Sequence, residues 1–527
     1  MLTLVRDRLG IKPLYYGWMG RRFVFGSELK ALRAAPGFDN EIDRDALTLL
    51  LRHDYILSPY SIYQGIHKLQ PGTLLRVTTE LAANPLAREA LAARAETYWS
   101  ARQIAEGGVA DRFTGSPEAA AEQLETLLRD AVGLRMLADV PLGAFLSGGV
   151  DSSAVVALMQ AQSARSAQTF SIGFHEADYD EAKHAKAVAQ HLGTHHTELY
   201  VTPQQALDVI PNLPQMYDEP FADPSQIPTF LVSQLARKQV TVSLSGDGGD
   251  ELFAGYNRYF WGRRLWNWRG PIPGSLLRMT SRCLQSTQPV LGGALEWLMP
   301  LLPARMRVPH PRDKIGRLAD ILKLDSSDAL YLSLVSHWKE PESVVLGGHE
   351  PFTVLNNNTQ RAPLTDSIER MMYADLLSYL PGDILTKVDR ASMAVSLEAR
   401  VPLLDHRVVE FAWRLPLKMK IRDGQSKWLL RQVLYKYVPL ELIERPKMGF
   451  GMPIDVWLRG PLRDWAESLL SEDRLRREGY FNPQPIRVKW QEHLSGKHRW
   501  HYHLWDVLMF QAWLEQHTVP TTRNHVA

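Results

Sequence analysis

The protein has 527 residues, of which 45% are hydrophobic and 22% charged, a composition typical of a globular protein with more than one domain. The 60 basic and 58 acidic residues leave a formal net charge of +2, which gives no electrostatic indication of nucleic-acid binding. The single cysteine, Cys283, excludes an internal disulfide framework and fits a reducing cytoplasm, where we expect the protein to reside.

No segment predicts a targeting signal or a membrane span. Residues 1–10 carry charged side chains and no apolar core, unlike a signal peptide. The longest apolar stretch, Pro289 to Leu302, contains Glu296 and Pro300 and is too short to cross a bilayer as a helix. We therefore expect no membrane partner.

The first region, residues 1–77, has strand-like segments followed by short helices. The predicted strands span 13–18 and 22–25, and the predicted helices span 27–34 and 44–51. An Ala-rich, Gly-bearing stretch, residues 78–117, is predicted to be a connector.

The second region, residues 118–260, alternates between strand and helix patterns. The predicted strands are 140–146, 169–174, 196–200 and 240–244, and the predicted helices are 153–162, 179–191, 204–217 and 226–238. Such alternation predicts an α/β domain with a mostly parallel sheet and helices on both faces. Ligands of these sheets bind beyond the carboxyl ends of the strands.

The third region, residues 261–527, is predicted to be mostly helical. Its clearest helices are expected at 366–379, 383–397 and 426–436. Three tryptophans near the C-terminus recur at helical intervals and are interpreted as packing residues. The many histidines lack a consistent ligand spacing, so we expect no zinc site.

A small-residue loop lies between the strand 140–146 and the helix that follows it. Its sequence is Ser147-Gly148-Gly149-Val150-Asp151-Ser152-Ser153. Backbone N–H groups and hydroxyls there can converge on an anion at a helix N-terminus, and Asp151 can face a phosphate-bound metal ion. No lysine follows the glycines, so this is not a Walker A loop; it is similar to the loop of PP-loop ATP pyrophosphatases. The alternative is a serine-rich helix cap.

A second loop follows the strand 240–244 and combines glycines with acids. It runs Ser245-Gly246-Asp247-Gly248-Gly249-Asp250-Glu251, and its glycines permit close approach to a ligand. Acids at this density repel one another unless a cation neutralises them, and a Mg²⁺ ion shared with Asp151 would do so. The alternative is a solvated acidic turn.

Five ordered motifs resemble those of the asparagine synthetase family (glutamine-hydrolysing). They are residues 147–153, 171–174, 218–225, 245–256 and 397–405. The resemblance runs from about residue 120 to the C-terminus. It implies a parallel-sheet PP-loop ATP pyrophosphatase domain (adenine nucleotide alpha hydrolase-like) at 118–527, with a nucleotide-binding core at 118–260 and a helical part at 261–527.

The resemblance also implies roles for particular residues. Ser147, Gly148, Gly149, Val150, Asp151, Ser152, Ser153 and Ser245 would hold ATP and pyrophosphate, and Leu146, Ile172 and Gly246 would line adenine and ribose. Asp151 and Asp250 would bind Mg²⁺, and Asp247 would face the amino-acid substrate. ATP and Mg²⁺ are thus the expected cosubstrate and cofactor.

Three further residues carry implied catalytic roles. Lys447, in a Gly-bearing loop, matches a lysine that stabilises growing negative charge in similar enzymes. Tyr256 and Glu398 match an acid–base pair of related cyclising synthetases. We expect only an orienting role for them in this protein, because Glu398 can pair with Arg400.

Residues 1–77 resemble the last part of an N-terminal nucleophile (class II) glutaminase domain, and we interpret them as its remnant. In the family, this part follows a segment with a cysteine nucleophile, and this chain starts after that segment, whether by nature or through a shortened gene model. Cys283 lacks the features of that nucleophile and is interpreted as structural. We expect free ammonia or a separate glutaminase to supply nitrogen.

The sequence leaves three functions open. The first is adenylation of aspartate to β-aspartyl-AMP with release of pyrophosphate, followed by amidation to asparagine. The second is the same chemistry on another carboxylate, such as a polysaccharide uronic acid or a peptide. The third is a noncatalytic ATP-binding scaffold, which the retained Asp151, Asp250 and Lys447 argue against. The sequence also leaves a homodimer open.

Overall fold

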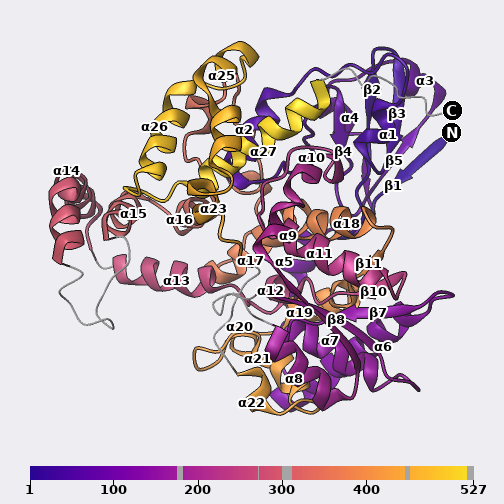
Figure 1. The fold of residues 1–527 in the computed structure, drawn as a ribbon. Helices are drawn as coiled ribbons and strands as arrows, with labels where there is room; N and C mark the ends of the chain where they lie inside the picture. Colours follow the sequence, from indigo (N-terminus) through magenta and orange to yellow (C-terminus); the bar gives the residue numbers. More distant parts are fainter. Residues whose placement is uncertain (175–181, 271, 299–310, 445–450, 519–527) are drawn as a thin grey trace.

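The computed structural model describes residues 1–174, 182–270, 272–298, 311–444 and 451–518. Side chains are described throughout these ranges except at residues 288–298 and 311–313. Figure 1 shows two small N-terminal sheets near the chain start, a central α/β core, and helices that extend away from it. No helix in the described ranges is both long and apolar enough to span a bilayer.

The N-terminal part contains two antiparallel sheets. One has the order β1 (Leu2–Val5), β5 (Thr73–Val77), β6 (Glu96–Thr97), and the other β3 (Arg22–Gly26), β2 (Tyr15–Met19), β4 (Ile66–Lys68). A small apolar core that includes Leu4, Trp18 and Leu75 packs between them. The two short helices are α1 (Leu29–Arg33) and α2 (Arg44–His53), and the Asp43 side chain caps α2. The strands and helices predicted for this region are confirmed.

The stretch predicted to be a connector contains regular structure. It holds α3 (Thr79–Ala83), α4 (Arg88–Ala92), β6 and α5 (Ala101–Ala110). The next helix, α6 (Pro117–Met136), starts with a Ser116 cap and Pro117 in its first turn, a favourable N-terminal pair.

The core sheet has five parallel strands. Their order is β11 (Glu398–Arg400), β10 (Val242–Leu244), β7 (Leu142–Phe145), β8 (Gln168–Phe174), β9 (His195–Val201). The predicted parallel sheet is therefore confirmed, with one strand, β11, that the sequence did not predict.

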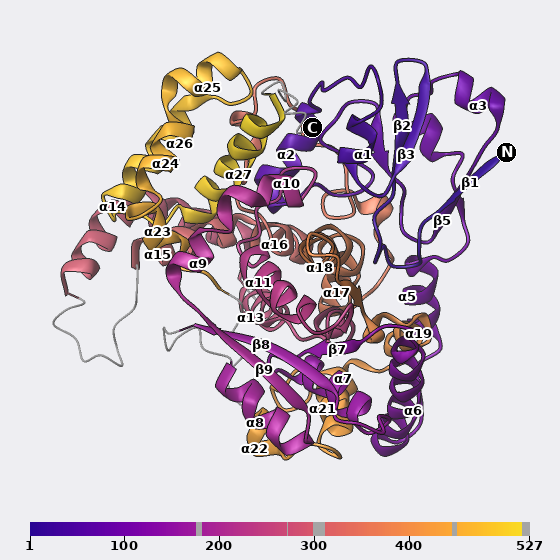
Figure 2. The same cartoon turned by 45° about the vertical axis from the view of Figure 1, so that its right-hand side comes forward.

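Helices cover both faces of this sheet (Figure 2). One side carries α6, α7 (Val150–Gln160), α8 (Ala182–Leu192) and α21 (Trp428–Leu434). The other carries α11 (Gln226–Arg237), α17 (Ser367–Leu377) and α18 (Leu385–Met393). Burial between two helical layers explains why the inner strands β7, β8 and β10 are almost continuously apolar or small.

The strand order reverses between β7 and β10. The chain leaves β7 toward β8 and β9, and then returns to place β10 on the opposite side of β7. The pair is in register, with Val242 beside Leu142 and Leu244 beside Ala144. Loops that leave two such strands diverge and open a crevice, the usual ligand site of an open parallel sheet. Both glycine loops start here.

One predicted helix is interrupted by proline, and another is shorter than predicted. Residues 204–217 divide into α9 (Pro203–Leu207), a 3₁₀ turn at Ile210–Asn212 and α10 (Leu213–Met216), with Pro211 and Pro214 in the later pieces. A π-turn at Leu380–Ile384, which contains Pro381, precedes α18. α18 ends at Met393, so the predicted helix 383–397 is too long.

The remaining helices surround the core. They are α12 (Gly249–Leu252), α13 (Asn257–Arg269), α14 (Gly274–Leu298), α15 (Pro311–Lys323), α16 (Ser327–Leu334), α19 (His406–Arg414), α20 (Leu417–Lys420), α22 (Leu440–Ile443), α23 (Ile454–Arg459), α24 (Arg463–Leu470), α25 (Glu472–Glu478), α26 (Pro483–Leu494) and α27 (His501–Thr518). As predicted, this part of the chain is mostly helical. Trp505 and Trp513 on α27 are fully buried, and Trp500 is partly buried against the core.

The loop that carries Asp218 and Glu219 joins the N-terminal part to the core. The Asp218 carboxylate accepts hydrogen bonds from the backbone N–H groups of Leu29 (3.1 Å) and Lys30 (3.3 Å) and lies 3.1 Å from Arg390. Glu219 forms a buried ion pair with Lys68 on β4. This motif therefore positions the N-terminal sheets against the core.

Candidate active site

A cavity of about 720 Å³ opens at the carboxyl ends of β7 and β10. Its wall includes both glycine loops, Phe170 and Ser171 of β8, one end of α11, and residues 423–427 before α21. The volume lies within the range of small-molecule and cofactor sites. The two loops meet in one cavity, as predicted from their strands.

The first loop presents small polar groups at the start of α7. Gly149 is the N-cap residue of α7, and Gly148 has φ +73°, a conformation that favours glycine. The Ser147 and Ser152 hydroxyls lie 3.0 Å apart. Hydroxyls next to a helix N-terminus suit a phosphate or pyrophosphate group.

The second loop packs directly on the first. A Cβ atom added at Gly246 would lie 2.6 Å from the Ser152 backbone N, and one added at Gly249 would collide with the Asp151 carboxylate. Glycine is therefore required at both positions for the loops to approach. The Ser245 backbone N–H donates to the Arg400 carbonyl (2.8 Å), so β11 supports the loop from outside.

One lysine bridges the acids of the two loops. The Lys427 Nζ forms an ion pair with Asp151 and lies 2.8 Å from Asp250 Oδ1. Burial alone would lower the pKa of Lys427, but the Asp151 and Asp250 carboxylates raise it above its ordinary value. Lys427 therefore carries a positive charge at neutral pH and neutralises acids that would otherwise repel each other.

The same carboxylates fit a divalent cation. Asp151 and Asp250 lie on opposite loops of the cavity, and both pair with the ammonium group of Lys427. Carboxylate oxygens are hard ligands, which suit Mg²⁺. No cluster of three or more candidate protein ligands exists within the described ranges. Mg²⁺ usually keeps few protein ligands and takes the rest from water and substrate phosphates, so a pair of aspartates is sufficient.

A second cation, Lys387, also lies in the cavity wall. The Lys387 Nζ forms an ion pair with Asp223 and lies 3.5 Å from Asp383 Oδ1. Burial acts to lower the pKa of Lys387, but the Asp223 and Asp383 carboxylates outweigh it and raise that pKa. Burial raises the pKa of Asp247, whose carboxylate accepts a hydrogen bond from the Ser245 hydroxyl.

Glu251 and Tyr256 form a buried pair at the cavity wall. The Tyr256 hydroxyl donates to Glu251 Oε1 at 2.7 Å, and the Arg258 guanidinium lies 3.9 Å from the centre of the Tyr256 ring. Burial, reinforced by Asp250, raises the pKa of Glu251 to about 8. A carboxyl group with this pKa can exchange a proton near neutral pH.

Most of the predicted site residues line this cavity. They are Leu146, Ser147, Gly148, Gly149, Val150, Asp151, Ser152, Ser245, Gly246, Asp247, Asp250 and Tyr256. Ser153 and Ile172 lie behind the wall, fully or nearly fully buried in the core. The predicted lysine, Lys447, lies outside the described residues.

Glu398 is not placed beside Tyr256. It lies on β11, and its carboxylate accepts a hydrogen bond from Arg400 Nε at 2.7 Å. The pairing with Arg400 that the sequence suggested is confirmed, and Tyr256 bonds to Glu251 instead. The reason is strand geometry. β11 is an edge strand of the sheet, and Glu398 and Arg400, two residues apart, point to the same face of it.

Sequence reasoning missed Lys427, Lys387 and Glu251. Lys427 falls inside the helix predicted at 426–436, yet it has φ +54° and precedes α21. A signal was available for Lys427, because the turn dipeptide Asp423-Gly424 indicates a loop just before it. Lys387 is recognised only from the folded structure, since its partner Asp223 lies 164 residues away along the chain. The partners of Glu251, Asp250 and Tyr256, are close in sequence, but its raised pKa comes mainly from burial, which the sequence does not show.

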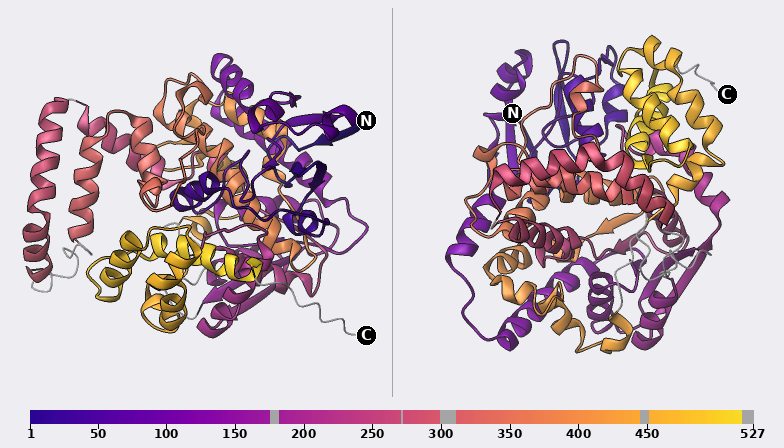
Figure 3. Two further views of the ribbon diagram at one scale, coloured as in Figure 1. Left: turned by 90° about the horizontal axis from the view of Figure 1, so that it is seen from above. Right: turned by 90° about the vertical axis from the view of Figure 1, so that its left-hand side faces the viewer.

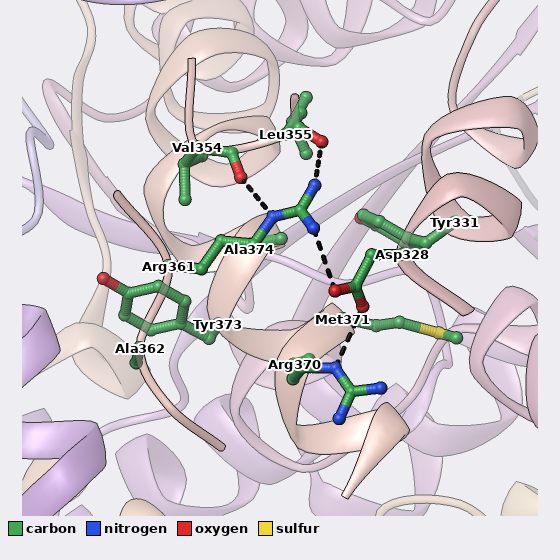
Figure 4. Close-up of a pocket in the computed structure, with 10 residues that line it drawn as sticks. All are labelled: Asp328, Tyr331, Val354, Leu355, Arg361, Ala362, Arg370, Met371, Tyr373 and Ala374. Carbon is green, nitrogen blue, oxygen red and sulfur yellow. Dashed lines mark hydrogen bonds and ion pairs between the residues drawn. The ribbon is translucent and has the colours of Figure 1, made fainter. Parts of the chain in front are cut away.

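A second, much smaller cavity of about 20 Å³ is closed by ion pairs rather than open to a ligand (Figure 4). Arg361 Nη1 and Arg370 Nε each lie 2.9 Å from an oxygen of Asp328. Because Asp328 is paired with two arginines and the cavity has room for about one water molecule, we interpret this cluster as structural.

Comparison with known proteins agrees with this geometry. A family model described as asparagine synthase matches residues 123–515, and a glutamine amidotransferase domain model matches residues 1–85. Whether residues 1–77 are a remnant of such a domain stays a prediction.

Curated relatives extend over nearly the whole chain. It is 29% identical to asparagine synthetase [glutamine-hydrolyzing] 1 of Bacillus subtilis, over 99% of this chain and 77% of that protein. It is 32% identical to a putative asparagine synthetase [glutamine-hydrolyzing] of Mycobacterium tuberculosis, over 97% of this chain and 74% of that protein. A more distant relative, at 23% identity over 91% of this chain and 72% of that protein, is amidase chyE of Penicillium rubens.

The asparagine synthase model includes both glycine loops, Lys387, Lys427 and the strand β11 that supports the second loop. The family match and the cavity thus coincide in the same residues. The chain therefore belongs to the asparagine synthase family, as an α/β ligase with an N-terminal match to a glutamine amidotransferase domain.

Proposed function

We propose that this protein uses ATP to adenylate a carboxylate and then amidates the activated acyl group, with aspartate as its acceptor and asparagine as its product. One observation carries the proposal. Two glycine loops from neighbouring strands meet in one cavity, with Asp151, Asp250 and Lys427 at their contact. That arrangement suits a triphosphate cleaved between its α- and β-phosphorus atoms.

The first loop would hold the departing pyrophosphate. The N–H groups at the start of α7 and the Ser147 and Ser152 hydroxyls supply donors at a helix N-terminus. Asp151 and Asp250 would hold Mg²⁺, which when bound neutralises phosphate charge. Lys427, already charged, would then be released from the two carboxylates to face phosphate oxygens.

The acceptor would lie beyond the second loop. We assign Asp247 to the amino-acid substrate and Lys387 to the charge balance of that wall. We assign Glu251 and Tyr256 only an orienting role in that wall, because a pKa of about 8 leaves Glu251 protonated at neutral pH and unable to take the proton that the attacking ammonia loses. Lys447 remains our proposed cation for the growing negative charge.

A second acceptor class is favoured by one observation. The relatives of this chain include fungal proteins named amidases. The same adenylation and amidation could therefore act on a different carboxylate, such as a uronic acid or a peptide side chain.

The decisive experiment measures pyrophosphate and AMP release from Mg–ATP with aspartate and with a panel of other carboxylates. Glutamine and ammonium salts are compared as nitrogen donors in parallel. Asp151→Asn is expected to lower pyrophosphate release by at least ~100-fold, whereas Asp111→Asn, a change at an exposed ion pair, leaves it unaltered. Formation of ADP instead of AMP would disprove the proposal, and activity only with another carboxylate would replace aspartate as acceptor.

A further inference from the structure

The chain next to the active-site cavity is strongly basic. From Leu252 to Leu295 the sequence contains six arginines and no aspartate, glutamate or lysine. Most of the described side chains of this stretch belong to α13 and to the part of α14 that ends at Thr287. We call these two segments together the α13–α14 arm. A protein with a net charge of +2 thus concentrates positive charge in one short segment.

One face of α13 anchors the arm to the core. Tyr259 is fully buried, and the Arg258 Nη2 lies 2.8 Å from Asp375 on α17. A Cβ atom added at Gly262 would lie 2.9 Å from the Met371 Cε, so α13 lies close against α17. This contact fixes the direction of the helix and of the residues on its other face.

The other face of α13 is exposed and aromatic. Trp261, Arg264 and Trp268 follow one another at helical spacing, and the two tryptophan side chains are each 57% exposed. The Arg264 guanidinium lies 5.9 Å from the centre of the Trp261 ring. Two tryptophans this exposed on one helix are unusual unless something covers them.

The start of α14 continues the pattern. Leu276 and Met279 are 46% and 58% exposed, and Arg278 and Arg282 lie between and beyond them. The Arg278 Nη1 atom lies 3.8 Å from Asp325 Oδ1, which is a long ion pair. Arg264 and Arg282 form no ion pair with any residue that the structure describes. Figure 3 shows the α14–α15 hairpin projecting away from the rest of the molecule.

Exposed tryptophan and leucine next to unpaired arginine match the surface of an anionic bilayer. Tryptophan favours the boundary between headgroups and acyl chains, and arginine is attracted to anionic lipid headgroups. A second copy of this chain is a poorer occupant, because a two-fold contact through this face would bring arginines against arginines.

We propose that the α13–α14 arm attaches this protein to the surface of anionic phospholipid bilayers. The cavity residues Tyr256 and Asn257 lead directly into α13, which is roughly 20 Å long for its 13 residues. Attachment through the arm therefore holds the active site close to the bilayer, and no helix in the described residues needs to span it. The proposal departs from the expectation, drawn from the sequence, of no membrane partner.

The test is vesicle flotation of the full chain with phosphatidylcholine alone and with added phosphatidylglycerol, at low and high salt. We expect binding only to the anionic vesicles, weakened by salt. Arg264→Glu with Arg282→Glu should reduce binding by at least about 25-fold, since each arginine near the surface contributes about fivefold. Trp261→Glu with Trp268→Glu should reduce it by about tenfold or more.

The matched control is Phe352→Glu, at a side chain 71% exposed and outside the arm, which should leave vesicle binding unchanged. Unaltered unfolding midpoints confirm that each variant folds. The proposal is overturned if the full chain ignores anionic vesicles at low salt, or if the arm variants still bind. It is also overturned if sedimentation shows a dimer that the tryptophan variant dissociates, because the face is then a self-association surface. Flotation measures binding and not turnover, so its outcome is independent of the proposed chemistry.

Discussion

Lys427 holds the two loops of the active site together through charge. Its ammonium group lies between Asp151 and Asp250, and the lysine side chain is only 7% exposed. Removing one member of a buried ion pair leaves the other charges uncompensated, which is more costly than losing the attraction alone. A cation in this position thus neutralises the two aspartates, and a metal ion would take over that role when nucleotide binds.

Lys427→Met should destabilise the protein by about 3 kcal/mol, because Asp151 and Asp250 are left facing each other. Excess Mg²⁺ should restore more stability to this variant than it adds to the unaltered protein, since the ion takes over the neutralising role. Denaturant unfolding with and without Mg²⁺ measures both effects. Lys436→Met, at a half-exposed ion pair with Glu125, is the control. Equal stability of Lys427→Met and the unaltered protein would refute the bridging role.

Glu251 makes stability depend on pH in a defined direction. Burial and the Asp250 carboxylate raise its pKa in the folded protein from an ordinary 4.5 to about 8. Between these values the folded state keeps a proton that the unfolded state has lost, so stability is full below about pH 4.5 and falls as pH rises through 8. The slope is at most about 1.4 kcal/mol per pH unit.

Glu251→Gln should therefore flatten the loss of stability between pH 5 and pH 8, because glutamine has no proton to lose and still accepts from Tyr256. Denaturant unfolding of both proteins across this range gives the comparison. Parallel stability curves for the two proteins would show that Glu251 does not carry the raised pKa.

At the scale of elements, the active site depends on how closely β10 and its loop approach α7. Gly246 meets the backbone of Ser152 directly, so its lack of a side chain sets the distance between the loops. The parallel pairing of β10 with β7 and β11 fixes the direction of that loop. Backbone contacts of this kind tolerate no added atom.

Gly246→Ala should abolish pyrophosphate release and lower stability by roughly 2 kcal/mol, because the new methyl group forces the loops apart. Gly107→Ala on α5, where an added Cβ atom meets nothing within 4 Å, should instead stabilise by about 0.5–1 kcal/mol. Pyrophosphate assays and thermal unfolding distinguish the two. Retained activity in Gly246→Ala would mean that the loops do not need this contact.

The elements with strong periodicity were predictable, and those fixed by tertiary contacts were not. Strands β7, β8 and β10 and helices α7 and α11 follow from apolar runs, cap residues and glycine loops. Strand β11 has the sequence Glu-Ala-Arg, which carries no strand signal, and it exists because β10 offers an edge to pair with. The glycine loops identified the cavity. The lysines of the cavity, Lys387 and Lys427, could not be predicted from the sequence in this way. Lys387 lies 164 residues from Asp223, and Lys427 lies 276 residues from Asp151 along the chain.

At the scale of the molecule, the N-terminal sheets and the core form one interlocked unit. Asp218 joins α1 to Arg390 on α18, and the Trp513 indole of α27 donates to the Asp218 carbonyl at 2.9 Å. Glu219 pairs with Lys68 on β4 and accepts a hydrogen bond from the Ile62 backbone N–H at 3.3 Å. Helices and strands from both ends of the chain thus converge on two consecutive acids.

Glu219→Ala should therefore weaken the whole molecule and not only a surface loop. The change leaves the buried Lys68 ammonium without its carboxylate, which should cost about 3–5 kcal/mol at pH 7. Adding Lys68→Met to Glu219→Ala should recover much of that loss, because an apolar side chain tolerates the buried site better than a lone charge. The free energies of unfolding of Glu219→Ala, of Lys68→Met and of the double variant, measured with denaturant, together form a double-mutant cycle. If the double variant were as unstable as the sum of the singles, Lys68 and Glu219 would act independently, and the N-terminal sheets would not be held to the core by this pair.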